Sequence, residues 1–170
     1  YAARILIPED WVFDPAKAQD IVMQWHGVPG NWRPTHPNLA ISVGKDRWRI
    51  SQSHGSPQAG ATRNRHELDE PVKRGAWVSW IIHAKWSPED KGLIQIWRDG
   101  KLVHDVSGPN VYGTIGEEYT PYLKTGIYRP EWHLDNERKK LAFESEKTDV
   151  KRKTVYVADV KVGNKQSRLE

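Results

Sequence analysis

The sequence consists largely of short segments in which apolar and polar residues alternate, separated by stretches rich in Gly, Pro, Asn and Asp. Such alternation is typical of half-buried β-strands, because successive side chains of a strand point to opposite faces. The clearest example is Leu93–Arg98 and Lys101–Val106, which flank the two-residue turn Asp99-Gly100, a strong hairpin signal. No segment has a convincing helical period of ordinary length, and the spacing of alternating strands and helices is missing. The pattern therefore predicts an all-β chain.

Seven further segments carry a strand pattern: Tyr1–Ile7, Asp20–His26, Leu39–Val43, Arg47–Gln52, Ala76–Trp86, Tyr122–Tyr128 and Thr154–Val162. The third and fourth lie on either side of Gly44-Lys45-Asp46 and predict a second hairpin. Between the strands we expect loops, with a flexible polar loop or an edge over Ser53–Asn64 and another loop over Gly108–Thr120. Only 37% of the residues are hydrophobic, which suits a two-layer sandwich, since each strand buries only alternate residues.

The length of 170 residues fits one domain, which we expect to span residues 1–170. The chain begins inside the strand pattern of Tyr1–Ile7, so we expect that an upstream piece is missing and that the domain is incomplete at its N-terminus. Asp14-Pro15 is a plausible start of a short helical turn, and the charged stretch Trp132–Lys153 predicts a long excursion. There is no cysteine, no run of transmembrane length and no recognisable signal peptide.

Charge and aromatic content indicate two possible surface properties. The net charge of +4 favours polyanions, such as nucleic acid, anionic lipid or an acidic polysaccharide, although an ordinary solvated surface explains it as well. Nine Trp and six Tyr stand against two Phe. Trp and Tyr suit half-wet surfaces on which sugar rings stack, and they also occur simply as core residues.

Two strand segments carry residues suited to acid–base chemistry. In Gln24-Trp25-His26 the amide and the imidazole share one strand face, where an amide can bind a carboxylate and a neutral imidazole can accept a proton. In Tyr122–Tyr128 the alternation places Tyr122, Lys124, Gly126 and Tyr128 on one face. A nearby Lys stabilises a phenolate, because an opposite charge favours the ionised form. Taken separately, each segment also fits a strand whose polar face only meets water.

Other candidate groups are weaker. The segment Arg63-Asn64-Arg65-His66-Glu67 is either a basic loop that binds acidic groups or a solvated turn. The stretch Trp32–Leu39, with Arg33, His36 and Asn38, can form a loop at the edge of a groove. The seven histidines are scattered without metal-ligand spacing. Asp135-Asn136-Glu137 can touch Ca²⁺ but lacks an EF-hand pattern, and neither a serine nucleophile elbow nor a phosphate-binding glycine loop is present.

Taken together, these segments resemble the jelly-roll polysaccharide lyases, a broad group that includes heparin lyase I, glucuronan lyases and alginate lyases. Gln24-Trp25-His26 is similar to the group's Gln-x-His strand, and Tyr122–Arg129 is similar to its Tyr-Phe-Lys-x-Gly-x-Tyr strand. Ile7–Trp11 and Gly92–Lys101 match in order and spacing, although the latter pattern also occurs in lectin-like sandwiches. The resemblance implies a jelly-roll (concanavalin A-like) β-sandwich of two antiparallel sheets.

The resemblance also implies roles for individual residues. His26 would be the base or would neutralise the substrate, Tyr128 would be the catalytic tyrosine, Lys124 would support it, and Gln24 would hold the uronate carboxylate. We expect further substrate contacts from Arg129, Tyr122, Trp25, Arg63, Arg65, His66 and Asn110. One departure is that many relatives carry an Arg-x-Glu-x-Arg-like strand near the N-terminus, which supplies a carboxylate-binding Arg, and this chain does not begin with one.

The implied reaction is β-elimination of a uronic-acid-containing acidic polysaccharide such as alginate, glucuronan, a heparin-like chain or ulvan. Either His26 is the base and Tyr128 the acid, or Tyr128 serves both roles. We expect no required cofactor, a possible structural Ca²⁺, a monomer, a secreted or periplasmic location, and no nucleic-acid or membrane partner. The main alternative is a non-catalytic, lectin-like carbohydrate-binding sandwich. A glycoside hydrolase is a weaker alternative, because it needs two facing carboxylates, and no clear strand provides them.

Overall fold

All regular structure in the described part of the chain is β-strand. The computed structural model describes residues 1–13, 19–27, 36–114, 121–129, 134–135, 140–141, 150 and 152–164. Within these ranges every element is a strand. No helix of the length and apolar character needed to cross a membrane occurs among these residues. The predicted all-β class is therefore confirmed.

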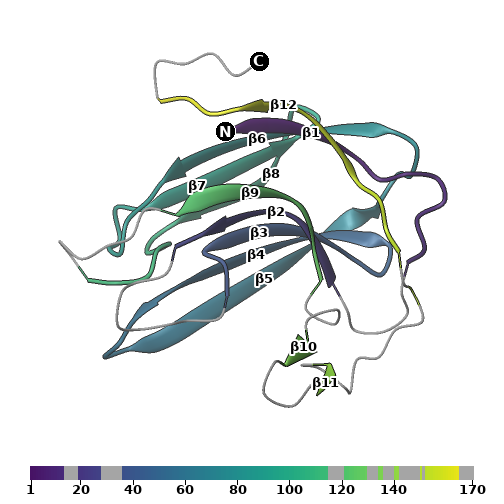
Figure 1. Ribbon diagram of the computed structural model, residues 1–170. Coiled ribbons are helices and arrows are strands. Elements are labelled where there is room, and N and C mark those ends of the chain that lie inside the picture. Colours follow the sequence, from purple (N-terminus) through teal and green to yellow (C-terminus); the bar gives the residue numbers. More distant parts are fainter. Residues whose placement is uncertain are drawn as a thin grey trace.

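Ten strands form two five-stranded antiparallel sheets, which lie against each other as the two layers of a sandwich (Figure 1). One sheet has the order β12-β1-β6-β7-β8 and consists of β12 (Tyr156–Lys161), β1 (Ala2–Leu6), β6 (Trp77–Lys85), β7 (Leu93–Arg98) and β8 (Lys101–Ser107). The other has the order β5-β4-β3-β2-β9 and consists of β5 (Gly60–Pro71), β4 (Arg47–Ser56), β3 (Leu39–Gly44), β2 (Gln19–His26) and β9 (Tyr122–Tyr128). A separate pair is formed by β10 (Leu134–Asp135) and β11 (Lys140–Leu141).

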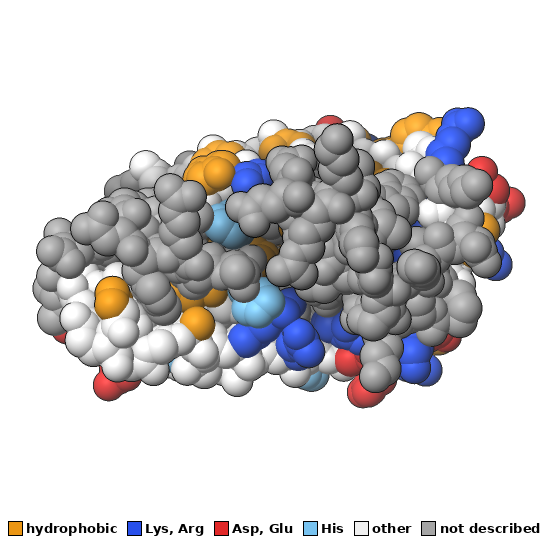
Figure 2. Space-filling model, turned by 60° about the horizontal axis from the view of Figure 1, so that its bottom comes forward, with side chains coloured by type: hydrophobic (Ala, Val, Ile, Leu, Met, Phe, Trp, Pro, Cys, Tyr) orange, Lys and Arg blue, Asp and Glu red, His pale blue; other side chains and the backbone are white. Residues whose placement is uncertain are grey.

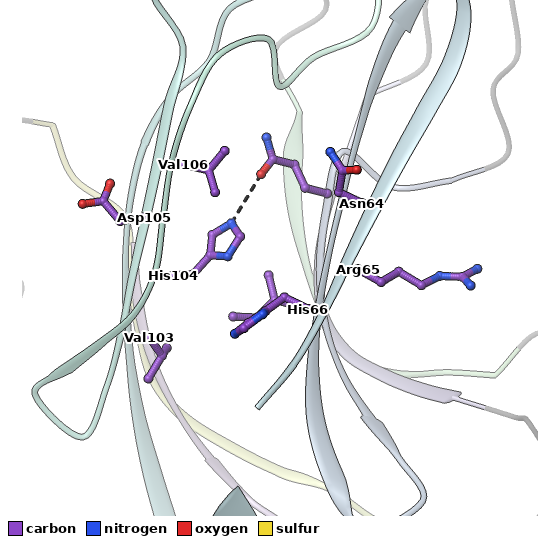
Figure 3. A pocket seen from close by; sticks show the side chains of 9 residues that line it. Asn64, Arg65, His66, Val103, His104, Asp105 and Val106 are labelled. Atoms are coloured by element: carbon purple, nitrogen blue, oxygen red, sulfur yellow. Dashed lines mark hydrogen bonds between the residues drawn. The ribbon is translucent and has the colours of Figure 1, made fainter. Parts of the chain in front are cut away.

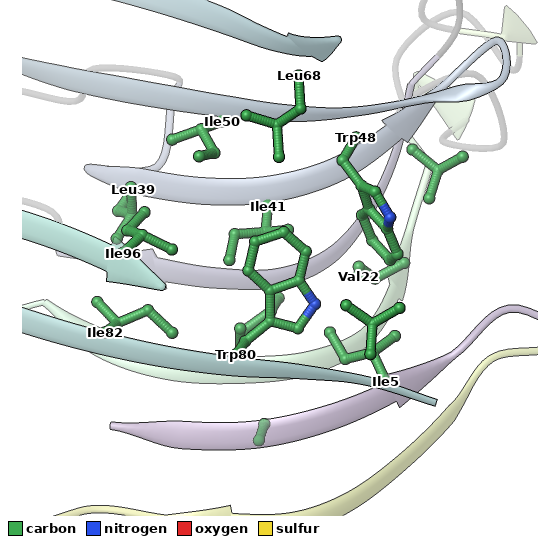
Figure 4. Close-up of a cluster of buried hydrophobic side chains, with 14 of the residues drawn as sticks. Ile5, Val22, Leu39, Ile41, Trp48, Ile50, Leu68, Trp80, Ile82 and Ile96 are labelled. Atoms are coloured by element: carbon green, nitrogen blue, oxygen red, sulfur yellow. The ribbon is translucent and has the colours of Figure 1, made fainter. Parts of the chain in front are cut away.

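The core lies between the two sheets, and both sheets contribute to it (Figure 4). On β6, Val78, Trp80 and Ile82 are buried and alternate with more exposed neighbours, as a half-buried strand requires. Trp80 meets Trp48 of the other sheet edge to face, with ring centroids 5.1 Å apart. Complete burial of side chains of this size stabilises the fold by about 1.5–3 kcal/mol each.

Both predicted hairpins are present. Asp99 and Gly100 have φ angles of 49° and 79°, the left-handed conformation that a tight turn between twisted strands requires. The Asp99 carboxylate accepts a hydrogen bond from the backbone N–H of Ser79, at 2.8 Å, which ties the turn to β6. The turn between β3 and β4 uses Lys45, with φ of 54°.

Of the two alternatives for Ser53–Asn64, a flexible loop or an edge, the structure has the edge, because most of this segment is strand. β4 continues to Ser56, the chain turns at residues 57–59, and β5 begins at Gly60, whose φ of 76° suits the turn. β5 is an edge strand that buries only Leu68. Since its face is almost entirely exposed and polar, it lacks the apolar alternation by which strands are recognised.

Some sequence predictions lie wholly or partly outside the described residues. These are the short turn at Asp14-Pro15, Arg33, the residues 136–137 of the possible Ca²⁺ site, and most of the charged stretch Trp132–Lys153. The described part of the expected loop Gly108–Thr120 includes Tyr112, which forms an isolated bridge to Gly55 at the end of β4.

Candidate active site

The sheet β5-β4-β3-β2-β9 has a face opposite the core, which we call the polar face. On β2, Met23 and Trp25 pack in the core. Because successive side chains of a strand alternate, Gln24 and His26 point to the polar face. The sequence 23–26 thus fixes which residues are structural and which are available for chemistry.

On the neighbouring strand β9 the same alternation holds. Leu123 and Ile127 pack against the core. Tyr122, Lys124 and Tyr128 therefore lie on the polar face, and all three are exposed. Two motifs that are about a hundred residues apart in sequence thus come together on adjacent strands.

Strand register arranges the polar face in three rows that run across the sheet. The central row is Lys124, Gln24, Ala40, Ser51 and Arg65, from β9 to β5. The histidine row places Tyr122 opposite His26 at one end and Ser53 opposite Arg63 at the other. The third row is Tyr128, Ile21, Ser42, Arg49 and Glu67.

His26 is half-buried, and its environment favours the neutral imidazole. Burial lowers the pKa of His26, and the positive charge of Lys124 lowers it further. Its Nδ1 atom is buried and has no hydrogen-bond partner among the described residues. Burial of an unpaired polar atom costs free energy. A neutral imidazole near pH 7 can act as a base.

Lys124 provides the positive charge of this cluster. Its ammonium lies 4.9 Å from the ring centroid of Tyr122, a cation–π distance. Lys124 is also directly opposite Gln24 in the register. The four residues Gln24, His26, Tyr122 and Lys124 therefore form one compact group, which we call the β2/β9 cluster.

Tyr128 lies on the same face but not beside His26. Its partner in the register is Ile21, beyond a bulge at which Gly126 adopts a φ of 120°. Ile21 lies five positions before His26 on β2, which corresponds to about 16 Å along the strand. The tyrosine directly opposite His26 is Tyr122.

A second group of cations lies at the β5 end of the rows. Arg63 is half-buried, and its guanidinium lies 3.2 Å from Nδ1 of His36. Burial and the charge of Arg65 lower the pKa of Arg63 to about 10. Figure 2 shows Lys and Arg side chains gathered next to histidine on the lower side of the molecule, where this sheet lies in Figure 1.

Comparison with known proteins shows the family of the chain. The family model described as polysaccharide lyase matches residues 1–161. The chain belongs to the polysaccharide lyase family. No curated protein matches this polysaccharide lyase family member.

A solved structure shows the same fold. The endo-β-1,4-glucuronan lyase from the fungus Trichoderma reesei superposes with a TM-score of 0.65 at 20% sequence identity. The match covers 78% of this lyase-family chain and 57% of the glucuronan lyase chain, so the chain matches little more than half of that protein's length. The likeness confirms the jelly-roll sandwich implied by the motifs.

Four residues predicted to bind substrate lie away from the polar face of this lyase-family chain. Trp25 is fully buried in the core, as the alternation of β2 requires. Asn110 is fully buried, and its side chain bonds the backbone of Ser87 and Lys85, which is a structural role. Arg129 is buried in an ion pair with Asp20, at 2.9 Å.

His66 is the fourth of these residues, and it faces the space between the two sheets. It is opposite the core residue Ile50 in the register, and its ring centroid is 6.1 Å from that of His104 on β8. Both rings line a cavity of about 420 Å³ at the open edge between β5 and β8 (Figure 3). There His104 contacts the buried amide of Gln52, at 3.4 Å.

Sequence reasoning missed two buried contacts that support the sheet carrying the site. Asp20 is buried on β2 between Arg129 and Lys153, which joins the sheet to the segment before β12. Tyr112 is buried, and its hydroxyl donates a hydrogen bond to the carbonyl of His36, which positions the partner of Arg63. No local pattern marks these contacts, since their partners are distant in sequence.

Metal binding has no support from the described side chains. In the described part of the chain, no group of three or more His, Asp and Glu side chains is placed to hold a metal ion. The β2/β9 cluster instead offers an amide, an imidazole, a phenol and an ammonium. These groups suit proton transfer and binding of an anion.

Proposed function

We propose that the chain cleaves a uronic-acid-containing polysaccharide by β-elimination at the β2/β9 cluster. The observation that supports this most is the register: Gln24 is opposite Lys124, and His26 is opposite Tyr122. A carboxylate-binding amide and a cation thus lie on the same two strands as a neutral base and a phenol, two residues away from them. Membership of the polysaccharide lyase family agrees with this reaction.

The reaction makes two demands that these residues meet. The proton on C5 of a uronate is weakly acidic while the adjacent carboxylate is negative, so the site must stabilise the enolate-like intermediate. Gln24 can donate a hydrogen bond to the carboxylate, and Lys124 supplies positive charge beside it. A base then takes the C5 proton, the electron pair forms the C4–C5 double bond, and the C4–O bond breaks. The leaving oxygen must receive a proton from an acid.

His26 is suited to be the base, because burial and Lys124 keep its imidazole neutral near pH 7. The acid is a tyrosine, and two are candidates. The motif resemblance implies Tyr128, whereas the register brings Tyr122 to His26. Base and acid must both reach one sugar ring. Tyr122 is directly opposite His26, whereas Tyr128 is opposite Ile21, farther along the strand, so the register favours Tyr122 as the partner of His26. A tyrosine that serves as both base and acid is the alternative, and it does not need His26 to take a proton.

The expected substrate class follows from the same site. Glucuronan is the first polymer to test, since the structurally similar protein is a glucuronan lyase; alginate, heparin-like chains and ulvan complete the panel. Such polymers lie outside cells, so this proposal includes a secreted or periplasmic location. It also includes a monomer that needs no cofactor, with Ca²⁺ at most in a structural role.

The test is the ultraviolet absorbance of the unsaturated uronate product, followed over this panel for the wild type, His26→Asn, Tyr122→Phe and Tyr128→Phe. We expect one polymer to be cleaved, and we expect Tyr122→Phe to lose about 10²–10⁴-fold in kcat. Thermal unfolding of each variant serves as the control for folding.

Each result has a distinct meaning. Loss of activity in Tyr128→Phe with little change in Tyr122→Phe would assign the acid to Tyr128 and refute the pairing with His26. Binding without cleavage by every form of the protein would refute the lyase and leave a carbohydrate-binding sandwich. An unchanged kcat in His26→Asn would show that tyrosine alone moves both protons.

A further inference from the structure

We propose that Arg63 and Arg65 on β5 form a second anion subsite, which binds a carboxylate of the same polymer several sugar units away from the bond that is cut. This inference rests on the proposed function, and it adds a requirement for chain length and for charge on distant sugars. The subsite is separate from the β2/β9 cluster and lies at the other end of the same rows.

Position is the first argument. Arg65 ends the central row that begins with Lys124, and Arg63 is two residues farther along β5, in the histidine row. Three strand spacings separate β2 from β5, which is about 14 Å, and four separate β9 from β5, about 19 Å. A single uronate bound at the β2/β9 cluster cannot reach so far. A chain of roughly four sugars can, if each ring advances by about one strand spacing.

The residues between the two ends are the second argument. The central row carries Ala40 and Ser51 between Gln24 and Arg65, and the histidine row carries Ser53 beside Arg63. These are short, uncharged side chains. Cations therefore occur at both ends of a row and not in its middle, as expected for a surface that binds separated carboxylates of one polymer.

Missing internal partners are the third argument. Among the described residues no carboxylate forms a salt bridge with Arg63 or Arg65. The two guanidinium groups instead repel each other, which is one cause of the lowered pKa of Arg63. The Nε atom of Arg63 is buried and has no hydrogen-bond partner in the described part of the chain. Two like charges and an unpaired buried donor lower stability unless a bound anion neutralises the charges and accepts the hydrogen bond.

Arg49 provides the contrast within the same sheet. It lies on the polar face in the third row, and Glu67 neutralises it at 2.9 Å. A carboxylate thus neutralises Arg49, whose role is structural, whereas no described carboxylate pairs with the arginines of the proposed subsite. His36 completes the subsite as a neutral neighbour, because burial and the two arginines lower its pKa.

The experiment compares Arg65→Gln and Arg63→Gln with the wild type on short and long oligomers of whichever polyuronate the wild type cleaves. Arg65 is exposed, so Arg65→Gln should fold normally, and Arg65→Lys should partly rescue it. The matched control is Arg4→Gln, which changes the net charge equally on the other sheet. For long oligomers we expect KM to rise roughly tenfold or more with kcat nearly unchanged, since a charge-assisted contact is lost. For oligomers too short to reach β5, we expect no change.

Two results would overturn the inference: an equal rise in KM for short and long oligomers, or no rise for either. Failure of the proposed function looks different. If the wild type cleaves no polymer, calorimetric binding of short and long oligomers of each polymer in the panel decides. Weaker binding of long oligomers alone in Arg65→Gln would retain the subsite and reject the lyase, whereas unaltered binding would reject both.

Discussion

The two outer faces of the sandwich differ in how far their charged and polar side chains find partners within the fold. On the β12-β1-β6-β7-β8 sheet, whose outer face we call the back face, several of these side chains are partnered. Arg4 binds Asp159 at 2.6 Å and stacks over Trp77. His83 contacts the amide of Gln95, at 3.2 Å, and Gln95 in turn donates to Asp105.

On the polar face most cations lack such partners. Lys124, Arg63 and Arg65 form no salt bridge with a described carboxylate, whereas Arg49 pairs with Glu67 and Arg47 with the adjacent Asp46. The same strand alternation produces both faces, so the difference lies in the choice of side chains. Paired charges keep a surface wet and soluble, whereas unpaired half-buried cations carry a cost that binding of an anion can offset.

The largest expected effect comes from replacing, one at a time, two histidines that both point outward, His26 on the polar face and His83 on the back face. His26→Asn should lower kcat by about 10²–10⁴-fold, because it removes the neutral base of the β2/β9 cluster. His83→Asn changes a histidine on the back face and should leave kcat within twofold or so of the wild type. Product absorbance measures both, and similar losses in both variants would show that the two faces do not differ in function.

An intermediate effect concerns pH. The pKa of His26 is lowered by burial and by Lys124, so the base stays neutral below the ordinary histidine pKa of about 6.5. The acid limb of kcat/KM should therefore lie below that value. Lys124→Gln removes the repulsion, so the pKa of His26 and the acid limb should both move upwards, even if the rate falls.

NMR titration of His26 measures this shift without any need for activity. Lys85→Gln is the control, since Lys85 is an exposed lysine on the other sheet. If the pKa of His26 were unchanged in Lys124→Gln, the electrostatic link across β2 and β9 would be refuted.

These comparisons also show what sequence could and could not reveal. The hairpin at Asp99-Gly100 and the sides taken by Gln24 and His26 follow from local rules, turn chemistry and alternation. The strand β5 could not be recognised, because an exposed edge buries only Leu68. Pairing of Tyr122 rather than Tyr128 with His26 depends on register and on the bulge near Gly126, which alternation within one strand does not determine.

Asn110 and Arg129 illustrate a second limit. Both are polar and lie near the ends of strands, where substrate contacts are common. The structure uses them for internal hydrogen bonds and an ion pair. A sequence displays the donors of a side chain but not whether the fold already satisfies them.

The smallest expected effect is on stability, and it has opposite signs on the two faces. Arg63→Gln removes a half-buried cation that burial and Arg65 disfavour, so the free energy of unfolding should rise by about 0.5–1 kcal/mol. Arg4→Gln breaks an exposed ion pair and should lower it by about 0.2–1 kcal/mol. Urea denaturation midpoints measure both. Added salt should reduce the change in Arg4→Gln and the part of the Arg63→Gln change that comes from repulsion by Arg65. Equal losses would mean that Arg63 is held by the fold as firmly as Arg4. In that case the unpaired cations could not be read as a site kept at the expense of stability.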